Sequence, residues 1–183
     1  MKIISTPIQG VYLVETTPFQ DERGIFYRAF CDRELDSLLQ GETIRQVNVS
    51  RSEAVGTIRG LHFQYPPHAE MKLIRCLRGR VWDVVVDLRQ GSPTFLKWYQ
   101  VDLSGDNHYM VVVPKGCAHG FQVLEAGSEL LYLHTAYYEP KSEGGIHYRD
   151  PKLNIPWLLE VTDISPRDAS HPLLSEDFQG IAL

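Results

Sequence analysis

The sequence predicts an all-β domain, a sandwich or a barrel, with a few short helices at its periphery. Short runs rich in Val, Ile, Leu, Tyr and Phe alternate with turn residues, as at Gly79, Gly91–Pro93 and Ser104–Asn107. Such runs are typical of strands bounded by turns. The alternation of strands with long helical segments that a parallel sheet requires is missing. Many short strands with little helix therefore favour a sandwich or a barrel.

Ten strands are expected along the chain. A hairpin is the clearest feature, because Gly79 separates two apolar runs and a glycine supplies the positive φ of a tight turn. The expected strands lie near residues 11–14, 24–30, 44–50, 57–63, 71–78, 80–88, 97–103, 109–113, 119–124 and 129–136.

One early segment has a helical pattern. Asp32 is a candidate N-cap, and leucines at 35, 38 and 39 follow the spacing of one helix face. Gly41 is expected to end this helix.

The segment from Tyr138 onward differs in texture, with five prolines among turn formers. We expect it to wrap the barrel rather than to extend a sheet. Ser165 and Pro166 are suited to the cap and first position of a short helical turn.

Length and composition bound the function. A chain of 183 residues suits one domain over residues 1–183, and a net charge of −5 argues against a general nucleic-acid binder. No apolar run is long enough for a signal peptide or a membrane span. The cysteines at 31, 76 and 117 have no metal or disulfide spacing, which favours a reducing compartment and a cytoplasmic location.

Candidate chemistry is concentrated in three places. The segment Arg59–Gln64 carries His62 and leads towards Lys72, the segment Pro114–Phe121 carries His119, and Tyr132 lies in an expected strand. Each group also has an ordinary structural interpretation. A lone histidine is often only hydrogen-bonded, a tyrosine is often a core aromatic, and Lys72, like Glu70, is by default a solvated charge.

A metal site is an alternative for some of these residues. His62, His68, Glu70 and His119 loosely match the two motifs of metal-binding cupins, in which imidazoles and a carboxylate ligate iron, manganese or zinc. Five residues separate His62 from His68, however, where that motif has one. We therefore predict no metal and no other cofactor.

The chain resembles the dTDP-4-dehydrorhamnose 3,5-epimerase family of deoxysugar epimerases from about residue 5 to residue 174. The resemblance implies a cupin-like jelly-roll barrel and a metal-free site. The matching blocks are Phe19–Phe26, Gln46–Ser50, Arg59–Gln64, Lys72, Gly91–Phe95, Pro114–Phe121, Tyr132, Tyr137–Tyr138 and Ser165–Asp168.

The resemblance also implies a mechanism. In a 4-keto sugar the hydrogens on C3 and C5 are acidic, so the enzyme needs a base, a partner for the enolate oxygen, and an acid on the opposite face. The base maps to His62, oriented by Asp168, whose carboxylate fixes the imidazole tautomer. Lys72 maps to the cation at the ketone. Tyr132 maps to the acid, because a phenol with a pKa of about 10 stays protonated at neutral pH.

Other positions map to substrate binding. Phe19 and Phe26 map to aromatic positions near the nucleotide. The other positions map to residues that bind the substrate, the polar ones at its diphosphate and sugar: Arg23, Gln46, Asn48, Arg59, His119 and Tyr138. The chain departs from the family at Arg28, where Glu is common, and at Leu133 and Ala136, where Lys and Asp are common. The preferred base and sugar therefore stay open.

We expect a homodimer, because an unpaired barrel edge is a liability that a partner strand covers. The resemblance implies exchanged N-terminal strands and partner residues in the nucleotide pocket. The resemblance also implies a nucleotide sugar as the substrate, and we expect neither a nucleic acid nor a membrane as a binding partner. A C3-only epimerase, a ketoisomerase on another nucleotide sugar, and a non-enzymatic sugar-binding module are the alternatives.

Overall fold

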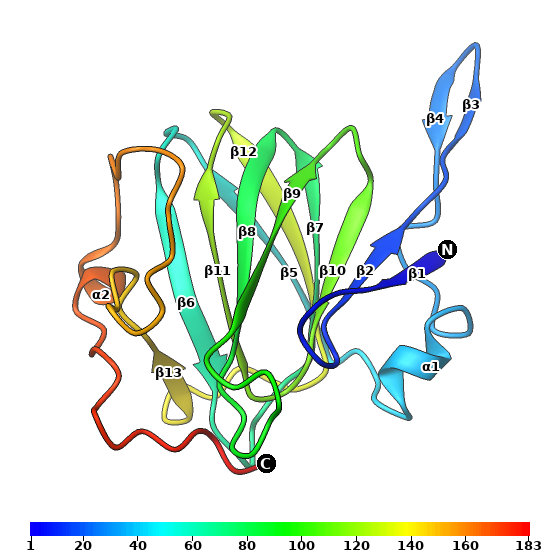
Figure 1. Cartoon of the computed structure of the whole chain (residues 1–183). Coiled ribbons are helices and arrows are strands. Elements are labelled where there is room, and N and C mark those ends of the chain that lie inside the picture. The colour runs from blue at the N-terminus through cyan, green and yellow to red at the C-terminus, as the bar shows by residue number, and fades with distance from the viewer.

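The chain folds into two antiparallel sheets packed face to face, as a computed structural model of all 183 residues shows (Figure 1). The six-stranded sheet has the order β1-β2-β10-β7-β12-β5 and the five-stranded sheet the order β13-β6-β11-β8-β9. This is a jelly roll, and the predicted all-β class is confirmed. The first sheet contains β1 (Lys2–Ser5), β2 (Tyr12–Glu15), β5 (Gln46–Ser52), β7 (Lys72–Arg78), β10 (Tyr109–Val113) and β12 (Ser128–His134); the second contains β6 (Ile58–Gln64), β8 (Arg80–Asp87), β9 (Trp98–Ser104), β11 (Cys117–Val123) and β13 (Glu143–Gly145).

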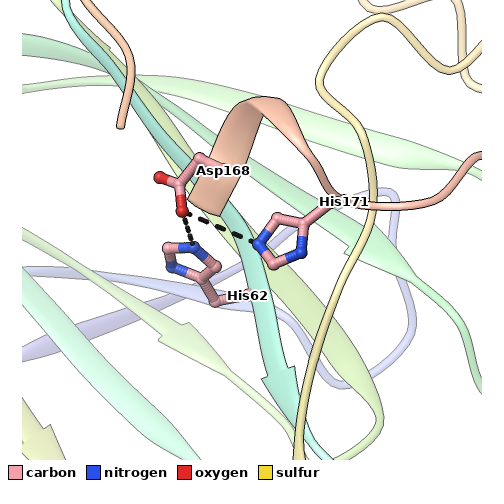
Figure 2. A group of neighbouring side chains, drawn as sticks. All are labelled: His62, Asp168 and His171. Carbon is pink, nitrogen blue, oxygen red and sulfur yellow. Dashed lines mark hydrogen bonds and ion pairs between the residues drawn. The ribbon is translucent and has the colours of Figure 1, made fainter. Parts of the chain in front are cut away.

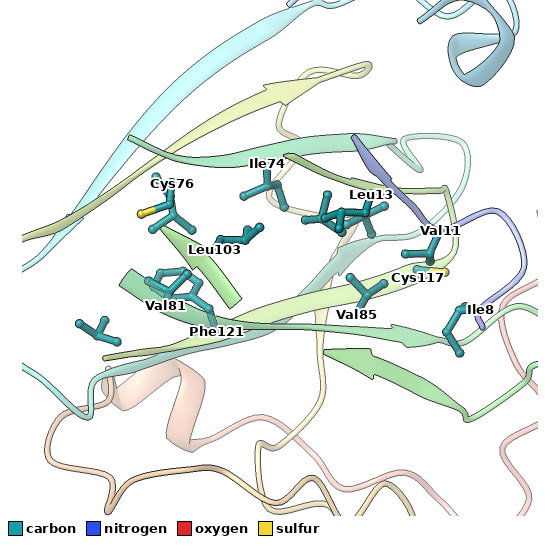
Figure 3. Close-up of a cluster of buried hydrophobic side chains, with 14 residues drawn as sticks. Ile8, Val11, Leu13, Ile74, Cys76, Val81, Val85, Leu103, Cys117 and Phe121 are labelled. Carbon is teal, nitrogen blue, oxygen red and sulfur yellow. The ribbon is translucent and has the colours of Figure 1, made fainter. Parts of the chain in front are cut away.

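The main core lies between the sheets (Figure 3). Strand alternation directs Ile74 and Cys76 of β7 inward, where they join Val85 and Phe121 of the opposite sheet. A second cluster lies on the outer face of the five-stranded sheet, where Leu153 and Ile155 of the C-terminal segment join Val84 and Val86. The C-terminal segment therefore covers this face of the barrel.

Three short strands were not predicted from the sequence: β1, β13 and β3 (Phe19–Asp21). Strand β3 pairs with β4 (Gly24–Phe26) in a hairpin that projects away from the body of the protein (Figure 1). The strand predicted over 24–30 is thus only three residues long. Strand β13 extends the five-stranded sheet, so the expectation that the C-terminal part adds no strand was wrong at this point.

The helices are single turns. Helix α1 (Asp36–Leu39) has Leu35 at its N-cap with no side-chain cap bond, so the predicted cap at Asp32 was wrong. The Asp32 carboxylate instead accepts a bond from the adjacent Arg33 amide at 2.7 Å.

Helix α2 (Pro166–Ala169) begins as predicted, with Pro166 at its start and the Ser165 hydroxyl accepting the Asp168 amide at 3.0 Å. Gly79 has φ of +73°, which confirms the hairpin turn. None of the helices has the length and apolar character needed to cross a membrane.

Candidate active site

A cavity of about 260 Å³ opens between the sheets. Strands β6 and β11 contribute one wall, and β5, β7 and β12 contribute the other. Most of the predicted site residues line this cavity, although in the sequence they extend from Asn48 to Tyr138. The lining residues are Asn48, Val49, Ser50, Arg59, His62, Glu70, Lys72, His119, Phe121, Tyr132, His134, Tyr138 and Glu143.

A histidine–carboxylate pair forms on the first wall (Figure 2). The Nε2 atom of His62 lies 2.8 Å from Oδ1 of Asp168. The other carboxylate oxygen of Asp168 accepts the Gly60 amide at 3.1 Å. Burial raises the pKa of Asp168, but the hydrogen bond and charge of His62 outweigh it, so this pKa is lowered. An ionised carboxylate only accepts hydrogen bonds, so in the neutral His62 ring Nε2 carries the proton and Nδ1 keeps its lone pair.

Backbone contacts bring these distant residues together. The Ile58 amide donates to the Asp163 carbonyl at 3.0 Å, and Ile58 and Ile164 form a parallel bridge, which places α2 beside β6. Gly60 has φ of +124°, and a Cβ there would lie 2.5 Å from the Gly120 Cα. Only glycine fits this close approach, and the buried Gly60 amide then donates to Asp168.

Lys72 extends from β7 in the opposite sheet. Its ammonium donates to the His62 carbonyl at 3.2 Å and lies 3.2 Å from Oε1 of Glu70. An ammonium has three N–H donors, so one stays free for a substrate oxygen. The Lys72 and Glu70 side chains are only 9% and 8% exposed, so the interpretation of both as solvated charges was wrong.

Tyr132 lies on β12, in the same sheet as Lys72 and across the cavity from His62. Its hydroxyl is 3.3 Å from the Ser50 hydroxyl. Burial raises the pKa of Tyr132 above its ordinary value. The phenol is therefore protonated at neutral pH and able to donate.

The predicted sugar and phosphate contacts are divided. Arg59, Asn48, His119 and Tyr138 line the cavity, whereas Gln46 does not; its side-chain oxygen accepts the Tyr138 amide at 3.2 Å. The ring of His119 is 2.7 Å from Oδ2 of the buried Asp83, so one nitrogen is already engaged.

The aromatic contacts predicted for the nucleotide do not reach the cavity. Phe19 and Phe26 are 82% and 78% exposed and belong, with Arg23, to the projecting hairpin. The Arg23 guanidinium pairs there with Asp21 at 2.6 Å. Within one chain these three residues are separate from the His62 site.

Sequence reasoning missed several cavity residues. His134 follows Tyr132 by two positions on β12, so strand alternation places both on one face and was the available signal. Its Nδ1 atom is 2.8 Å from Glu70, which thus bridges His134 and Lys72. Arg167 lines a neighbouring groove of about 570 Å³ that also contains Arg59, and it pairs with Glu143. No motif indicated Arg167.

The cupin-type ligand set does not assemble. His68 is not among the residues of the cavity, and Glu70 and His119 are engaged by His134 and Asp83. The histidine and carboxylate donors that do come together are those of His62, Asp168 and His171, within 4.8 Å of one another.

The chain is thus a cupin-type jelly-roll protein in which His62, bonded to Asp168, lies across one cavity from Lys72 and Tyr132. The family model described as dTDP-4-dehydrorhamnose 3,5-epimerase matches residues 5–176, and the chain belongs to this family.

Named relatives agree with this assignment. A dTDP-4-dehydrorhamnose 3,5-epimerase of Pseudomonas aeruginosa is 42% identical over 100% of this chain and 96% of its own. The dTDP-6-deoxy-D-glucose-3,5-epimerase of Legionella pneumophila, solved with dTDP-4-keto-L-rhamnose, is 45% identical with a TM-score of 0.89, over 94% and 92% of the two chains. A 3'-monoepimerase of Streptomyces bikiniensis, solved with dTDP-quinovose, is 31% identical with a TM-score of 0.86, over 93% and 86%. The chain is thus similar to epimerases with one and with two target carbons.

Proposed function

We propose that this protein epimerises a dTDP-linked 4-keto-6-deoxyhexose at C3 and C5, giving dTDP-4-keto-L-rhamnose. One observation carries the proposal: His62, bonded to Asp168 of α2, faces Lys72 and Tyr132 of the opposite sheet across one cavity. Inversion at carbon requires a base on one face of the sugar and an acid on the other. This arrangement supplies both.

The reaction begins at Nδ1 of His62. This nitrogen removes the proton from C3 or C5, and the electrons of the broken C–H bond pass to the carbonyl oxygen on C4. The free N–H of Lys72 stabilises the negative charge that develops on this oxygen in the transition state and is complete in the enolate. Asp168 stabilises the imidazolium that results.

Protonation of the carbanion completes the inversion. The Tyr132 hydroxyl donates a proton to the opposite face of the same carbon, and the enolate electrons return to form the new C–H bond. Because burial raises the pKa of Tyr132, the phenolate that results is a strong base and takes a proton from solvent, while the His62 imidazolium releases its proton to solvent. Ser50, 3.3 Å away, is positioned to assist.

The position of Arg59 indicates where the diphosphate binds. This residue lines both the cavity and the neighbouring groove, where Arg167 is also found. Guanidinium groups bind phosphate oxygens through paired N–H donors. We therefore assign the sugar to the cavity and the diphosphate to the boundary between cavity and groove.

Exposed apolar surface on the projecting hairpin and on β5 supports a homodimer. The projecting hairpin exposes Phe19 and Phe26, while Val47 and Val49 on edge strand β5 are 56% and 59% exposed. Exposed apolar surface and an unpaired edge both favour a partner chain. We propose that the hairpin of each subunit completes the other's nucleotide pocket. We also propose a cytoplasmic location, which suits three free cysteines.

The function is tested with purified protein and dTDP-4-keto-6-deoxyglucose, following the product by NMR. The native chain should form dTDP-4-keto-L-rhamnose, and His62→Ala should abolish turnover while keeping its melting temperature. His147→Ala, outside the cavity, is the matched control and should retain activity. Product inverted at C3 alone would identify a monoepimerase instead. Loss of activity only through loss of fold would leave His62 a structural residue.

A further inference from the structure

His171 lies beside the His62–Asp168 pair but has no part in the mechanism above (Figure 2). It follows α2, and its Nε2 atom is 3.6 Å from Oδ1 of Asp168, the same oxygen that His62 contacts at 2.8 Å. The two imidazole rings meet edge to face, with centroids 5.4 Å apart. One carboxylate oxygen thus has two imidazole neighbours, of which only His62 is within hydrogen-bonding distance.

A slot in β13 receives the ring of His171. Gly145 pairs with His62 across the ladder between β13 and β6. A Cβ on Gly145 would lie 2.3 Å from both Cε1 and Nε2 of His171, so any side chain there would displace the ring. The imidazole of His171 therefore occupies the space of the missing side chain, directly beside His62.

One polar atom of the His171 side chain has no structural partner. Nε2 is buried and has no hydrogen-bond partner. Buried polar groups are normally paired, so this one requires an explanation other than packing stability. The acceptor that a proton on Nε2 would reach first is the Asp168 carboxylate.

The charged neighbours of His171 are His62 on β6, Asp168 and Arg167 on α2, and Glu143 on β13. Burial lowers the pKa of His171, His62 and Arg167 lower it further, and the two carboxylates only partly compensate. The ring is therefore neutral at neutral pH and gains its charge only in acid.

We infer that His171 is a positioning residue for the epimerisation, one that holds Asp168 towards His62 when neutral and competes for the same carboxylate oxygen when protonated. The neutral ring packs beside Oδ1 and edge to face against the His62 ring, so it limits the movement of the carboxylate away from His62. The imidazolium of His171, in contrast, would draw Oδ1 towards itself and weaken the bond between Oδ1 and Nε2 of His62. This inference rests on the proposed function of the His62–Asp168 pair.

The pH dependence gives a readout that a packing role would not change. In the native chain two protons stop the reaction in acid, one on His62 and one on His171. The plot of log kcat/KM against pH should therefore fall with a slope that approaches two. His171→Asn keeps a polar side chain but cannot titrate, so its slope should stay at one. His147→Asn is the matched control and should behave as the native chain.

Displacing the ring without removing it gives a second test. Gly145→Ala should lower kcat at pH 8 about tenfold with KM within twofold, because a small misplacement of a catalytic pair is costly. If the effect passes through His171, then Gly145→Ala combined with His171→Ala should be no slower than His171→Ala alone.

The outcomes separate this inference from the proposed function. Equal acid slopes for the native chain and His171→Asn, or independent and additive effects of the two alanine substitutions, would overturn the role of His171. Both results presuppose turnover, so a native chain that does not epimerise would instead refute the proposed function. If Gly145→Ala fails to fold, the slope of His171→Asn still decides.

Discussion

Replacing Asp168 by asparagine tests the tautomer argument with almost no change in shape. The Gly60 amide donates to one oxygen of Asp168, and His62 faces the other. An asparagine has a single acceptor oxygen, and the Gly60 N–H requires it. Its NH₂ group is then directed at Nε2 of His62. That nitrogen must accept a bond, so the proton moves to Nδ1 and the base loses its lone pair.

The expected loss is large. Holding a catalytic histidine in the wrong tautomer lowers kcat by about 10⁴ in the serine-protease triad, and general-base catalysis as a whole contributes about 10²–10⁴. We therefore expect Asp168→Asn to lower kcat on the order of 10³-fold with KM within about threefold, since the carboxylate acts through His62 and not on the substrate.

Steady-state kinetics at pH 8, with thermal melting as the check on folding, would measure the effect. Asp177→Asn, an exposed aspartate of the same C-terminal segment, is the matched control and should be unaffected. A kcat for Asp168→Asn within threefold of the native value would refute the tautomer argument. A rise in KM with unchanged kcat would move Asp168 from the base to substrate binding.

Three further predictions concern other parts of the molecule. Tyr132→Phe should lower epimerisation at least about 100-fold, because the phenyl ring has no proton to donate, while His62 still exchanges the substrate hydrogen with D₂O without inversion; absence of both exchange and inversion would contradict the assigned role. Arg23→Ala should raise KM more than tenfold and leave kcat unchanged, and an unaltered KM would show that the projecting hairpin does not contact the nucleotide. The third concerns Asp87. Burial raises the pKa of its carboxyl group, but hydrogen bonds from Arg89, Ser92 and Thr94 outweigh burial and lower the pKa from an ordinary value of 3.8 to about 2. Because the pKa is depressed in the folded state, the ionised carboxylate stabilises the fold above pH 4, and this contribution is lost between pH 4 and pH 2. Asp87→Asn should therefore lower the free energy of unfolding by about 2 kcal/mol at pH 7 and by progressively less below pH 4. If the argument is wrong, denaturant unfolding would show the same difference between the two proteins at every pH.

The strands of the barrel were predictable because most of them carry long apolar runs between turn formers. The exceptions β1, β3 and β13 have only three or four residues, too few for a period to stand out. The cap at Asp32 failed because its carboxylate binds the neighbouring amide of Arg33 instead of the helix start.

Some of the residues that line the cavity were predictable, but the contacts between them were not. Asp168 is 106 residues from His62, and only the resemblance to a family suggested their contact. Lys72 and Glu70 seemed solvated by residue type, yet both line the cavity, Lys72 as the first residue of β7 and Glu70 just before it. His171 and Gly145 had no signal at all, because their contact depends on β13 lying next to β6.

Incubation with dTDP-4-keto-6-deoxyglucose in D₂O tests the central claim most directly, with NMR recording which ring carbons take up deuterium. If His62 and Tyr132 serve both carbons, deuterium should enter at C3 and at C5, and the product should be inverted at both. Uptake at C3 alone would contradict the two-carbon reaction, and uptake at neither would contradict proton transfer by this site.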